Sequence, residues 1–192
     1  LNPLGLNVDE TWRNAISGVS GAGKISLFDA SDQKTQIAAE VKGFDPVELF
    51  GRKDARRMDR VSQMALAASI EAMEHSGLQV NDNNRDRIGV IIGTGIGGIG
   101  TMIDQLYVFE DRGPTRVSPF FVPMMLPDTS PGLVAIHFGV RGPNLAVVTA
   151  CATGTNVIGE AMEMIRHGRV DAVIAGGSEA AILPLAISGM SV

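Results

Sequence analysis

The chain of 192 residues contains a single cysteine, Cys151, and only 5% of its side chains are aromatic. One cysteine excludes an internal disulfide framework and fits a reducing compartment. No apolar run reaches the roughly 18 residues that a membrane-spanning helix needs, and the first residues lack the basic and apolar regions of a signal peptide. These absences predict a soluble cytoplasmic protein that does not enter a membrane.

Positive charge is also scarce, because 16 basic residues stand against 21 acidic ones and the net charge is −5. Basic residues interleaved with aromatics are absent, so nucleic acid is not expected as a partner. The histidines His75, His137 and His167 share no spacing that would build a metal site with Cys151, so no metal is predicted. With 45% hydrophobic residues, the chain is large and apolar enough for one sizeable core, hence one domain or part of one.

The stretch 144–167 organises the rest of the sequence. Residues 145–148 are an apolar, β-branched run typical of a buried strand, and residues 154–165 place apolar side chains at helical spacing. Cys151 therefore lies where a strand turns into a helix, and the unpaired N–H groups of a helix start favour an exposed thiolate there. A lone cysteine is more often an inert core residue, whereas this position is typical of nucleophiles in α/β enzymes. The residues alone leave both interpretations open.

Strand and helix patterns alternate along the chain, which predicts an α/β fold with a largely parallel sheet. Asn7 and Glu10 have the spacing of a capping box at the first helix, and Ser130 and Pro131 are expected as N-cap and first turn of a later one. Helices are expected over residues 8–17, from residue 45, and over 52–76, 101–111, 130–138 and 154–165; strands are expected over 37–41, 87–92, 145–148 and 171–175.

Basic residues gather at the expected start of the long helix, at Arg52, Lys53, Arg56 and Arg57. Such a run is usually a solvated helix face. Its alternative is a docking patch whose local field attracts an acidic protein or a phosphate group.

Two loops have both a structural and a functional interpretation. Residues 95–100 read G-x-G-x-x-G between a strand and a helix, which is a dinucleotide fingerprint. We interpret the match as coincidental because no second strand ending in an acid follows about 20 residues on; the glycines let the backbone approach packed helices or an acyl chain. Residues 113–131 contain five prolines, which exclude a long helix, and form either a core-covering loop or the wall of a hydrophobic pocket.

Three motifs in order carry a family resemblance: SPFFVP at 118–123, VTACATG at 148–154 and AGGSEA at 175–180. Together they resemble the amino-terminal half of a bacterial β-ketoacyl-(acyl carrier protein) synthase of the type II class. The resemblance covers essentially the whole chain, so residues 1–192 are expected to be the amino-terminal domain of such a synthase. It implies a thiolase-like fold, a largely parallel mixed sheet flanked by helices.

The resemblance implies a decarboxylating Claisen condensation in fatty acid elongation, without a cofactor. Cys151 would accept the acyl group from a thioester, and its own backbone N–H would help to stabilise the carbonyl oxygen. A malonyl thioester on acyl carrier protein would then lose carbon dioxide and supply the attacking carbanion.

Further residues acquire roles from the same resemblance. Ile96 and Phe121 match residues that line the acyl pocket, and the basic residues Lys53, Arg56 and Arg57 match residues that dock the acidic acyl carrier protein. The strand before Cys151 resembles the strand at the dimer interface of the family, so a homodimer is expected.

Departures from the family pattern are as informative as the matches. The family's two active-site histidines and lysine, in motifs of the HGT and GHN kind, have no counterpart here, and the first, central strand of the sheet is missing. We therefore expect a fragment, incomplete at both ends, that does not complete the condensation alone. Alternatives are a polyketide ketosynthase or thiolase relative, a catalytically incomplete binding or scaffold fragment, and a nucleotide-binding domain built on residues 95–100.

Overall fold

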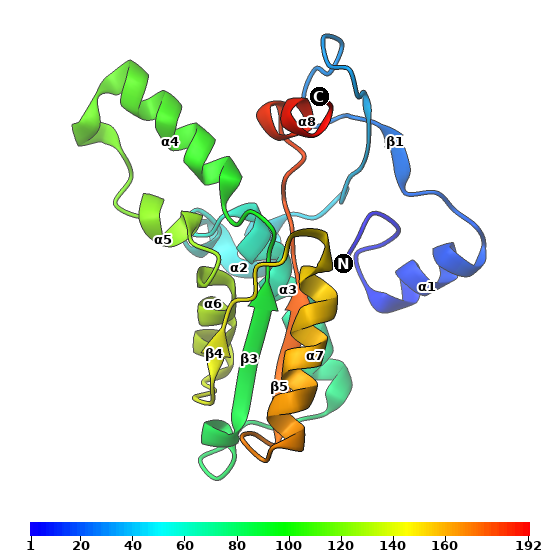
Figure 1. Cartoon of the computed structure of the whole chain (residues 1–192), viewed down its shortest axis with the longest axis vertical. Coiled ribbons are helices and arrows are strands. Elements are labelled where there is room, and N and C mark those ends of the chain that lie inside the picture. Colours follow the sequence, from blue (N-terminus) through cyan, green and yellow to red (C-terminus); the bar gives the residue numbers. More distant parts are fainter. The chain divides into compact units, whose positions relative to one another are not determined.

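The computed structural model describes all residues from 1 to 192 and divides them into two compact units (Figure 1). Unit 1 consists of residues 1–49 and 181–192, and unit 2 consists of residues 50–180. Unit 2 contains the larger sheet and every residue for which a functional role is expected. No helix of either unit has both the length and the apolar character needed to cross a membrane.

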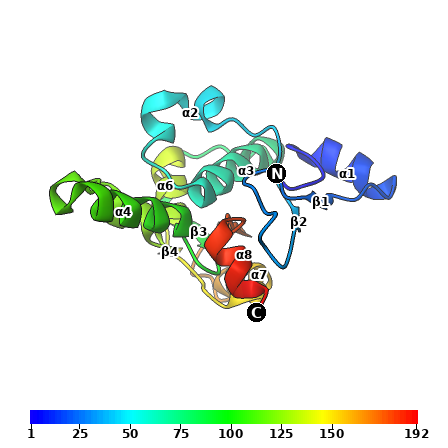
Figure 2. The same cartoon turned by 90° about the horizontal axis from the view of Figure 1, so that it is seen from above.

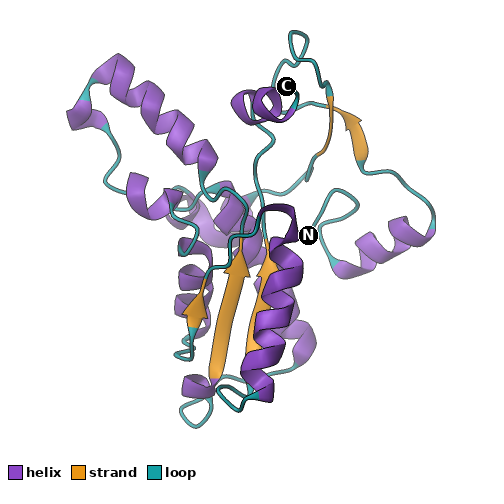
Figure 3. Ribbon diagram, in the orientation of Figure 1, coloured by secondary structure: helices purple, strands orange, loops and turns teal.

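A three-stranded parallel sheet is the centre of unit 2 (Figure 3). Its middle strand β3 (Ile88–Gly93) pairs with β4 (Asn144–Leu145) on one side and with β5 (Ala172–Gly177) on the other, and Ile88 lies opposite Ala172. All six residues of β3 are buried, which explains its unbroken apolar sequence, since a central parallel strand is covered on both faces. The α/β class and the parallel sheet are confirmed.

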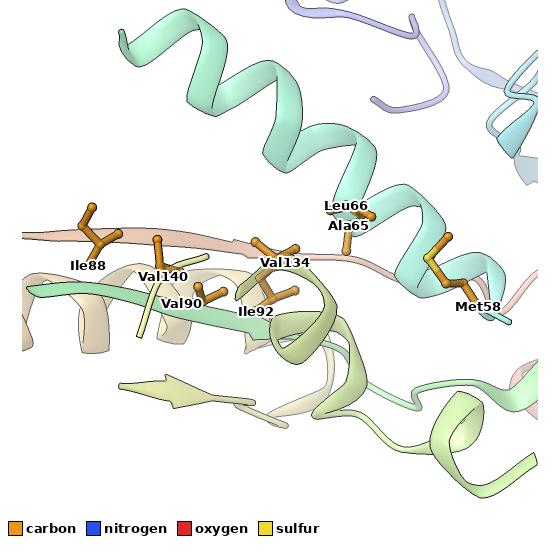
Figure 4. Close-up of a cluster of buried hydrophobic side chains, with 8 residues drawn as sticks. All are labelled: Met58, Ala65, Leu66, Ile88, Val90, Ile92, Val134 and Val140. Carbon is orange, nitrogen blue, oxygen red and sulfur yellow. The ribbon is translucent and has the colours of Figure 1, made fainter. Parts of the chain in front are cut away.

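Helices cover both faces of this sheet (Figure 2). Because successive strand residues point to opposite faces, Ile91 packs on α7 (Thr153–Arg166), while Val90 and Ile92 face α3 (Arg60–Ser76) and α6 (Thr129–Phe138). The α3/α6 side holds the larger cluster, shown in Figure 4: Met58, Ala65, Leu66, Ile88, Val90, Ile92, Val134 and Val140. The α7 side holds a smaller one: Ile91, Val157, Ala161, Met164 and Val170.

The remaining elements of unit 2 connect these layers. Helix α4 (Ile99–Arg112) confirms the helix expected after the glycine-rich loop. Before α6 begins at Thr129, the proline-rich segment contains only short helices, the 3-10 turn η2 (Pro114–Arg116) and the five-residue α5 (Phe121–Met125). Two further 3-10 turns, η1 (Arg85–Arg87) and η3 (Ala150–Ala152), precede β3 and α7.

Unit 1 is built from α1 (Val8–Ile16), the antiparallel pair β1 (Ala22–Lys24) and β2 (Ile37–Ala39), and α8 (Pro184–Met190). Asn7 is the N-cap of α1, as expected, and its side chain accepts the Glu10 N–H at 2.8 Å. In a capping box the Glu10 carboxylate would accept the N–H of the N-cap residue, Asn7. Here it accepts the N–H of Leu6 instead. Strand β1 is not among the strands expected from the sequence.

The carboxylate of Glu40, the residue that follows β2, is buried. Glu40 is 2% exposed and accepts the backbone N–H and hydroxyl of Ser26 at 2.8 and 2.6 Å and the N–H of Leu27 at 3.1 Å. Burial by itself raises the pKa of Glu40, but the hydrogen bonds from Ser26 and Leu27, together with the nearby charge of Lys42, outweigh it. The pKa of Glu40 therefore lies below its ordinary value of 4.5.

One expected helix is two helices in the structure. Residues 52–76 were expected to be continuous, but α2 (Pro46–Ala55) ends before the second half of the basic run, and α3 begins only at Arg60. Asp59 causes the break, because its extended backbone and its side-chain bond to the Val61 N–H form an N-cap. Helix α2 is itself interrupted at Gly51, whose φ of 73° is not helical.

Two smaller expectations are also wrong. The strand expected over residues 145–148 is paired only at Asn144–Leu145, because the chain then leaves the sheet toward η3. Ser130 is not the N-cap of α6; that position belongs to Asp128, and the buried Ser130 hydroxyl instead bonds the Ser62 hydroxyl of α3 at 3.0 Å. Ser130 therefore makes a hydrogen bond between two packed helices instead of the cap that its local sequence favours.

Candidate functional site

Cys151 lies in η3, between the end of β4 and the start of α7, and is exposed. The elbow is tight: the Thr149 N–H donates to the Thr153 hydroxyl at 2.9 Å, and the Ala152 N–H donates to the Thr149 carbonyl at 3.1 Å. Ala150 has a φ of 51°, and it is the one non-glycine residue of the chain with a positive φ. A left-handed alanine is strained, and the strain falls on the residue next to the thiol.

The backbone around the thiol favours negative charge. The N–H of Cys151 lies in the 3-10 turn that directly precedes a 14-residue helix, where the helix dipole favours negative charge. An exposed thiol at such a helix start is suited to a nucleophile, with backbone N–H groups nearby for an oxyanion.

Gly93, the last residue of β3, allows the elbow to lie against the sheet. A Cβ atom at Gly93 would lie 2.2 Å from Cγ2 of Thr153 and 2.5 Å from the carbonyl oxygen of Val147. These distances are far below contact distance, so a side chain here would displace the segments on both sides of Cys151. The carboxyl end of β3 and the elbow are therefore one packed site.

The glycine-rich loop that follows β3 is held by an acidic residue. The Glu179 carboxylate accepts the N–H groups of Gly95 and Ile96 at 2.8 and 3.2 Å. These N–H groups are the ones that a pyrophosphate would need, and a carboxylate that already occupies them repels phosphate. The geometry disfavours a dinucleotide site at residues 95–100. Glu179 belongs to the AGGSEA motif of the family resemblance, but no role was predicted for it from the sequence.

The two residues expected to line an acyl pocket belong to segments in contact. The Gly98 N–H of the loop donates to the Met125 carbonyl of α5 at 3.0 Å, and α5 begins at Phe121. The Ile96 side chain is 48% exposed, and Phe121 is partly buried. The structure brings the loop that carries Ile96 and the helix that carries Phe121 together.

The expected docking residues Lys53, Arg56 and Arg57 are all exposed. Lys53 lies in the last turn of α2, and Arg56 and Arg57 lie in the connection to α3. The guanidinium of Arg57 lies 4.8 Å from the centre of the Phe120 ring, within range of a cation–π interaction. The basic run thus contacts the proline-rich segment next to Phe121.

Asp59 fixes the end of this connection. Besides capping α3, its second carboxylate oxygen accepts the N–H and the hydroxyl of Thr101 at 2.9 and 2.7 Å. Asp59 is buried, and it thereby joins the first turns of α3 and α4. Nothing in the spacing of Asp59 and Thr101 along the sequence could have revealed this bond.

The histidines lie away from the elbow. His75 and His137 are in the last turns of α3 and α6, and His167 is the C-cap of α7. Helix α7 begins at the elbow, so His167 is separated from Cys151 by the length of a helix, about 21 Å. No three His, Cys, Asp or Glu side chains are grouped so as to hold a metal ion.

An exposed cysteine at a strand-to-helix elbow, at the carboxyl edge of a parallel sheet with helices on both faces, defines an α/β protein of the kind that uses an elbow nucleophile. Residues 1–192 match the family model "Beta-ketoacyl synthase, N-terminal domain", and the chain belongs to this family. The resemblance found in the sequence motifs is confirmed.

The relatives place the chain within that family. It is 49% identical over 191 residues to 3-oxoacyl-(acyl-carrier-protein) synthase 2 of Staphylococcus aureus (strain N315) and 44% identical to the protein of the same name from Synechocystis sp. (strain ATCC 27184 / PCC 6803 / Kazusa). Each alignment covers 100% of this chain and 46% of the relative. The chain therefore spans about half the length of the curated relatives that it matches.

Solved structures agree with the fold. The structure titled "The ishigamide ketosynthase/chain length factor" superposes with a TM-score of 0.83 at 26% identity, over 99% of this chain and 47% of that one. A β-ketoacyl synthase from Burkholderia phymatum STM815 gives a TM-score of 0.71 at 27% identity, over 88% of this chain and 42% of that chain. The thiolase-like architecture of the amino-terminal half is confirmed.

Proposed function

We propose that this chain is the acyl-accepting part of a 3-oxoacyl-(acyl carrier protein) synthase in fatty acid elongation. The observation that carries the proposal is the exposed Cys151 on a strained elbow at the start of α7. The 49% identity to a synthase of that name supports the fatty acid reaction, and it exceeds the 26% identity to the ishigamide ketosynthase.

The acyl transfer follows from this geometry. Sγ of Cys151 attacks the carbonyl carbon of an acyl thioester, a new C–S bond forms, the donor's C–S bond breaks, and the carrier leaves as its thiol with the proton that Cys151 gave up. The Cys151 N–H is directed to the oxyanion that forms on the carbonyl oxygen. Ile96 and Phe121 line the acyl chain, and a thioester needs no metal or cofactor for this step.

The condensation would consume this acyl-enzyme. The bond between the malonyl α-carbon and its carboxylate breaks, carbon dioxide leaves, and the carbanion attacks the acyl carbonyl; a C–C bond forms and Cys151 leaves as thiolate. No histidine is placed at the elbow to assist decarboxylation, because all three lie at the far ends of their helices. Helix α7 starts at the elbow, the first turn of α3 bonds Ser178 at the carboxyl end of β5, and the chain after α6 bonds Ile88 at the amino end of β3. We therefore expect the isolated chain to become acylated and not to release a ketoacyl product.

The test is intact-mass spectrometry of the folded chain after incubation with a medium-chain acyl thioester. One acyl addition is expected, and Cys151→Ser, the matched control, should show none. No addition to folded wild-type protein would overturn acyl transfer by this chain, and ketoacyl product formed with malonyl-carrier would overturn the claim that it stops at the acyl-enzyme.

The proposed partner is an acidic acyl carrier protein that docks on Lys53, Arg56 and Arg57. Their exposure supports this role, and so does their gathering in a chain whose net charge is −5. Changing all three to Glu should abolish carrier binding in a titration at low salt, whereas Arg169→Glu, a single exposed charge elsewhere in unit 2, should not. Equal binding by both variants would reject the docking site. A cytoplasmic homodimer is the proposed state of the protein.

A further inference from the structure

The Glu179 carboxylate, just after β5, accepts three hydrogen bonds from the glycine-rich loop and one from its neighbour Ala180. Its Oε2 accepts the N–H groups of Gly95 and Ile96 at 2.8 and 3.2 Å, and its Oε1 accepts the Thr94 hydroxyl and the Ala180 N–H, both at 3.3 Å. Hydrogen bonds to an ionised acceptor are about twice as strong as neutral ones. One side chain therefore fixes three consecutive residues of the loop.

The loop is further tied by its own residues. The Thr94 hydroxyl, which donates to Glu179, also accepts the Gly97 N–H at 3.1 Å. Thr94 is buried, and the network involves each residue from Thr94 to Gly97. The path of the backbone at Ile96 is set by the carboxylate on one side and by Thr94 on the other.

The backbone that presents Glu179 is itself anchored. The N–H of Ser178 donates to the Gly93 carbonyl at 3.0 Å, and the Ser178 hydroxyl donates to the Val61 carbonyl at 2.8 Å. The residue before Glu179 is thus bonded both to β3 and to the first turn of α3. Because Ser178 is bonded on both sides, the Glu179 carboxylate is held in place relative to the sheet, and it holds the loop in turn.

The elbow lies on the same side of Gly95 as the Glu179 carboxylate. A Cβ atom at Gly95 would lie 2.8 Å from Oε2 of Glu179 and 3.7 Å from Cα of Ala150. The space beside Gly95 is therefore bounded by both the carboxylate and the strained residue that precedes Cys151. A loop released from Glu179 is free to shift relative to the elbow.

We propose that Glu179 is a positioning residue that holds Ile96 opposite the Cys151 elbow and thereby sets which acyl chains reach the thiol. This inference rests on the proposed function, in which Ile96 contacts the acyl chain. Glu179 itself does not touch the reacting atoms; it acts through the two N–H groups that it accepts. Loss of the carboxylate should widen the accepted range of acyl lengths rather than remove the nucleophile.

The experiment compares Glu179→Ala and Glu179→Gln with Glu160→Gln, a matched control on the exposed surface of α7. The rate of mass addition at Cys151 is measured for four-, eight- and twelve-carbon acyl thioesters and, separately, for iodoacetamide, which reports the thiol without acyl recognition. Amide hydrogen exchange at Gly95 and Ile96 is measured by NMR in the same variants.

Glu179→Ala should exchange the Gly95 and Ile96 amides about tenfold faster and change the ratio of the twelve- to the four-carbon rate about tenfold, with the iodoacetamide rate within about twofold of wild type. Glu179→Gln, which keeps one acceptor oxygen and the side-chain length, should recover part of both effects. Glu160→Gln should match wild type in every measurement.

The two proposals fail in different ways. Unchanged exchange at Gly95 and Ile96 would reject the positioning role, whatever the acylation data show. Faster exchange with an unchanged length ratio would reject the specificity role, and a parallel loss of iodoacetamide reactivity would assign Glu179 to the fold as a whole. If wild-type protein reacts with iodoacetamide and with no acyl thioester, the proposed function fails, and the specificity role of Glu179 fails with it.

Discussion

At the scale of single residues, the packing of the site requires that residue 93 has no Cβ atom, so that only glycine fits there. Replacing Gly93 with Ala would force the new methyl group into Thr153 and the Val147 carbonyl, at 2.2 and 2.5 Å. Since backbone must move to relieve the second contact, the free energy of unfolding should fall by about 2–3 kcal/mol. Urea denaturation followed by circular dichroism measures the change, and acylation of Cys151 should fall with it.

Gly132 provides the control for this substitution. It lies inside α6, and a Cβ atom there would meet nothing within 4 Å. Gly132→Ala should therefore raise the free energy of unfolding by up to about 1 kcal/mol, because alanine loses less conformational entropy in a helix. A Gly93→Ala variant as stable as Gly132→Ala would contradict the close packing of the elbow on the sheet.

Protonation of Glu40 should make the free energy of unfolding of unit 1 depend on pH. Its pKa is lower in the folded state than its ordinary value of 4.5, so its contribution to stability is present above about pH 4.5 and is lost as the pH falls through the folded pKa. Glu40→Gln should lower the free energy of unfolding at pH 7 by about 1.5 kcal/mol, since charge-assisted bonds from Ser26 and Leu27 become neutral.

The measurement is urea denaturation between pH 7 and pH 3. The difference between wild type and Glu40→Gln should shrink as the pH falls, because protonation makes the two side chains alike. Glu48→Gln, which alters an exposed carboxylate of the same unit, should run parallel to wild type. A constant difference for Glu40→Gln across the whole range would refute the linkage.

At the scale of elements, Asp59 joins two helices by their first turns. Asp59→Ala removes the N-cap of α3 and leaves the Thr101 N–H and hydroxyl without their acceptor in a buried position. The loss should be about 2–3 kcal/mol in urea denaturation. Asp54→Ala, an exposed acid of the preceding helix, should change stability by less than about 0.5 kcal/mol, and an equal effect of the two substitutions would argue against the shared cap.

Local signals decided which elements were predictable. The continuous apolar run of β3 and the 3.6-residue spacing in α7 identified both elements, because each buries a face that the sequence displays. The break at Asp59 was missed since its reason is partly Thr101, a partner 42 positions away. The two-residue β4 was overextended because residues 145–148 have strand composition, while the pairing ends where the elbow begins.

The residues of the candidate site also differ in whether local sequence could reveal them. Cys151 was found because its small neighbours and flanking patterns mark an elbow within ten residues of sequence. Glu179 was not found, since its role consists of hydrogen bonds to Gly95 and Ile96 across 84 and 83 positions. Long-range polar contacts have no periodicity, so only the folded chain reveals them.

At the scale of the whole molecule, β4 is one of the two edge strands of the sheet of unit 2. Leu145 in β4 and Val148 after it are 45% and 52% exposed, and an apolar strand edge tends to pair with another copy. If the proposed homodimer forms through β4, Leu145→Lys should place like charges near each other across the two-fold axis and produce monomers. Sedimentation equilibrium tests this expectation.

Ile136→Lys serves as the matched control for the edge. Ile136 on α6 is 80% exposed, so the same change in charge and hydropathy falls outside β4 and should leave the dimer intact. Monomeric wild-type protein at every concentration, or a dimeric Leu145→Lys variant, would rule out pairing through this strand.

The division of the chain at residues 49 and 181 determines the order in which the molecule is completed during translation. Unit 2 is one continuous segment, whereas unit 1 combines residues 1–49 with 181–192, and the hydroxyls of Ser188 and Ser191 bond the side chains of Gln33 and Thr35. A ribosome that adds about 5–20 residues per second leaves the first segment waiting on the order of ten seconds for the second. Throughout that interval unit 1 stays unfinished, and the Cys151 elbow with α7 and β5 is translated only shortly before the second segment of unit 1.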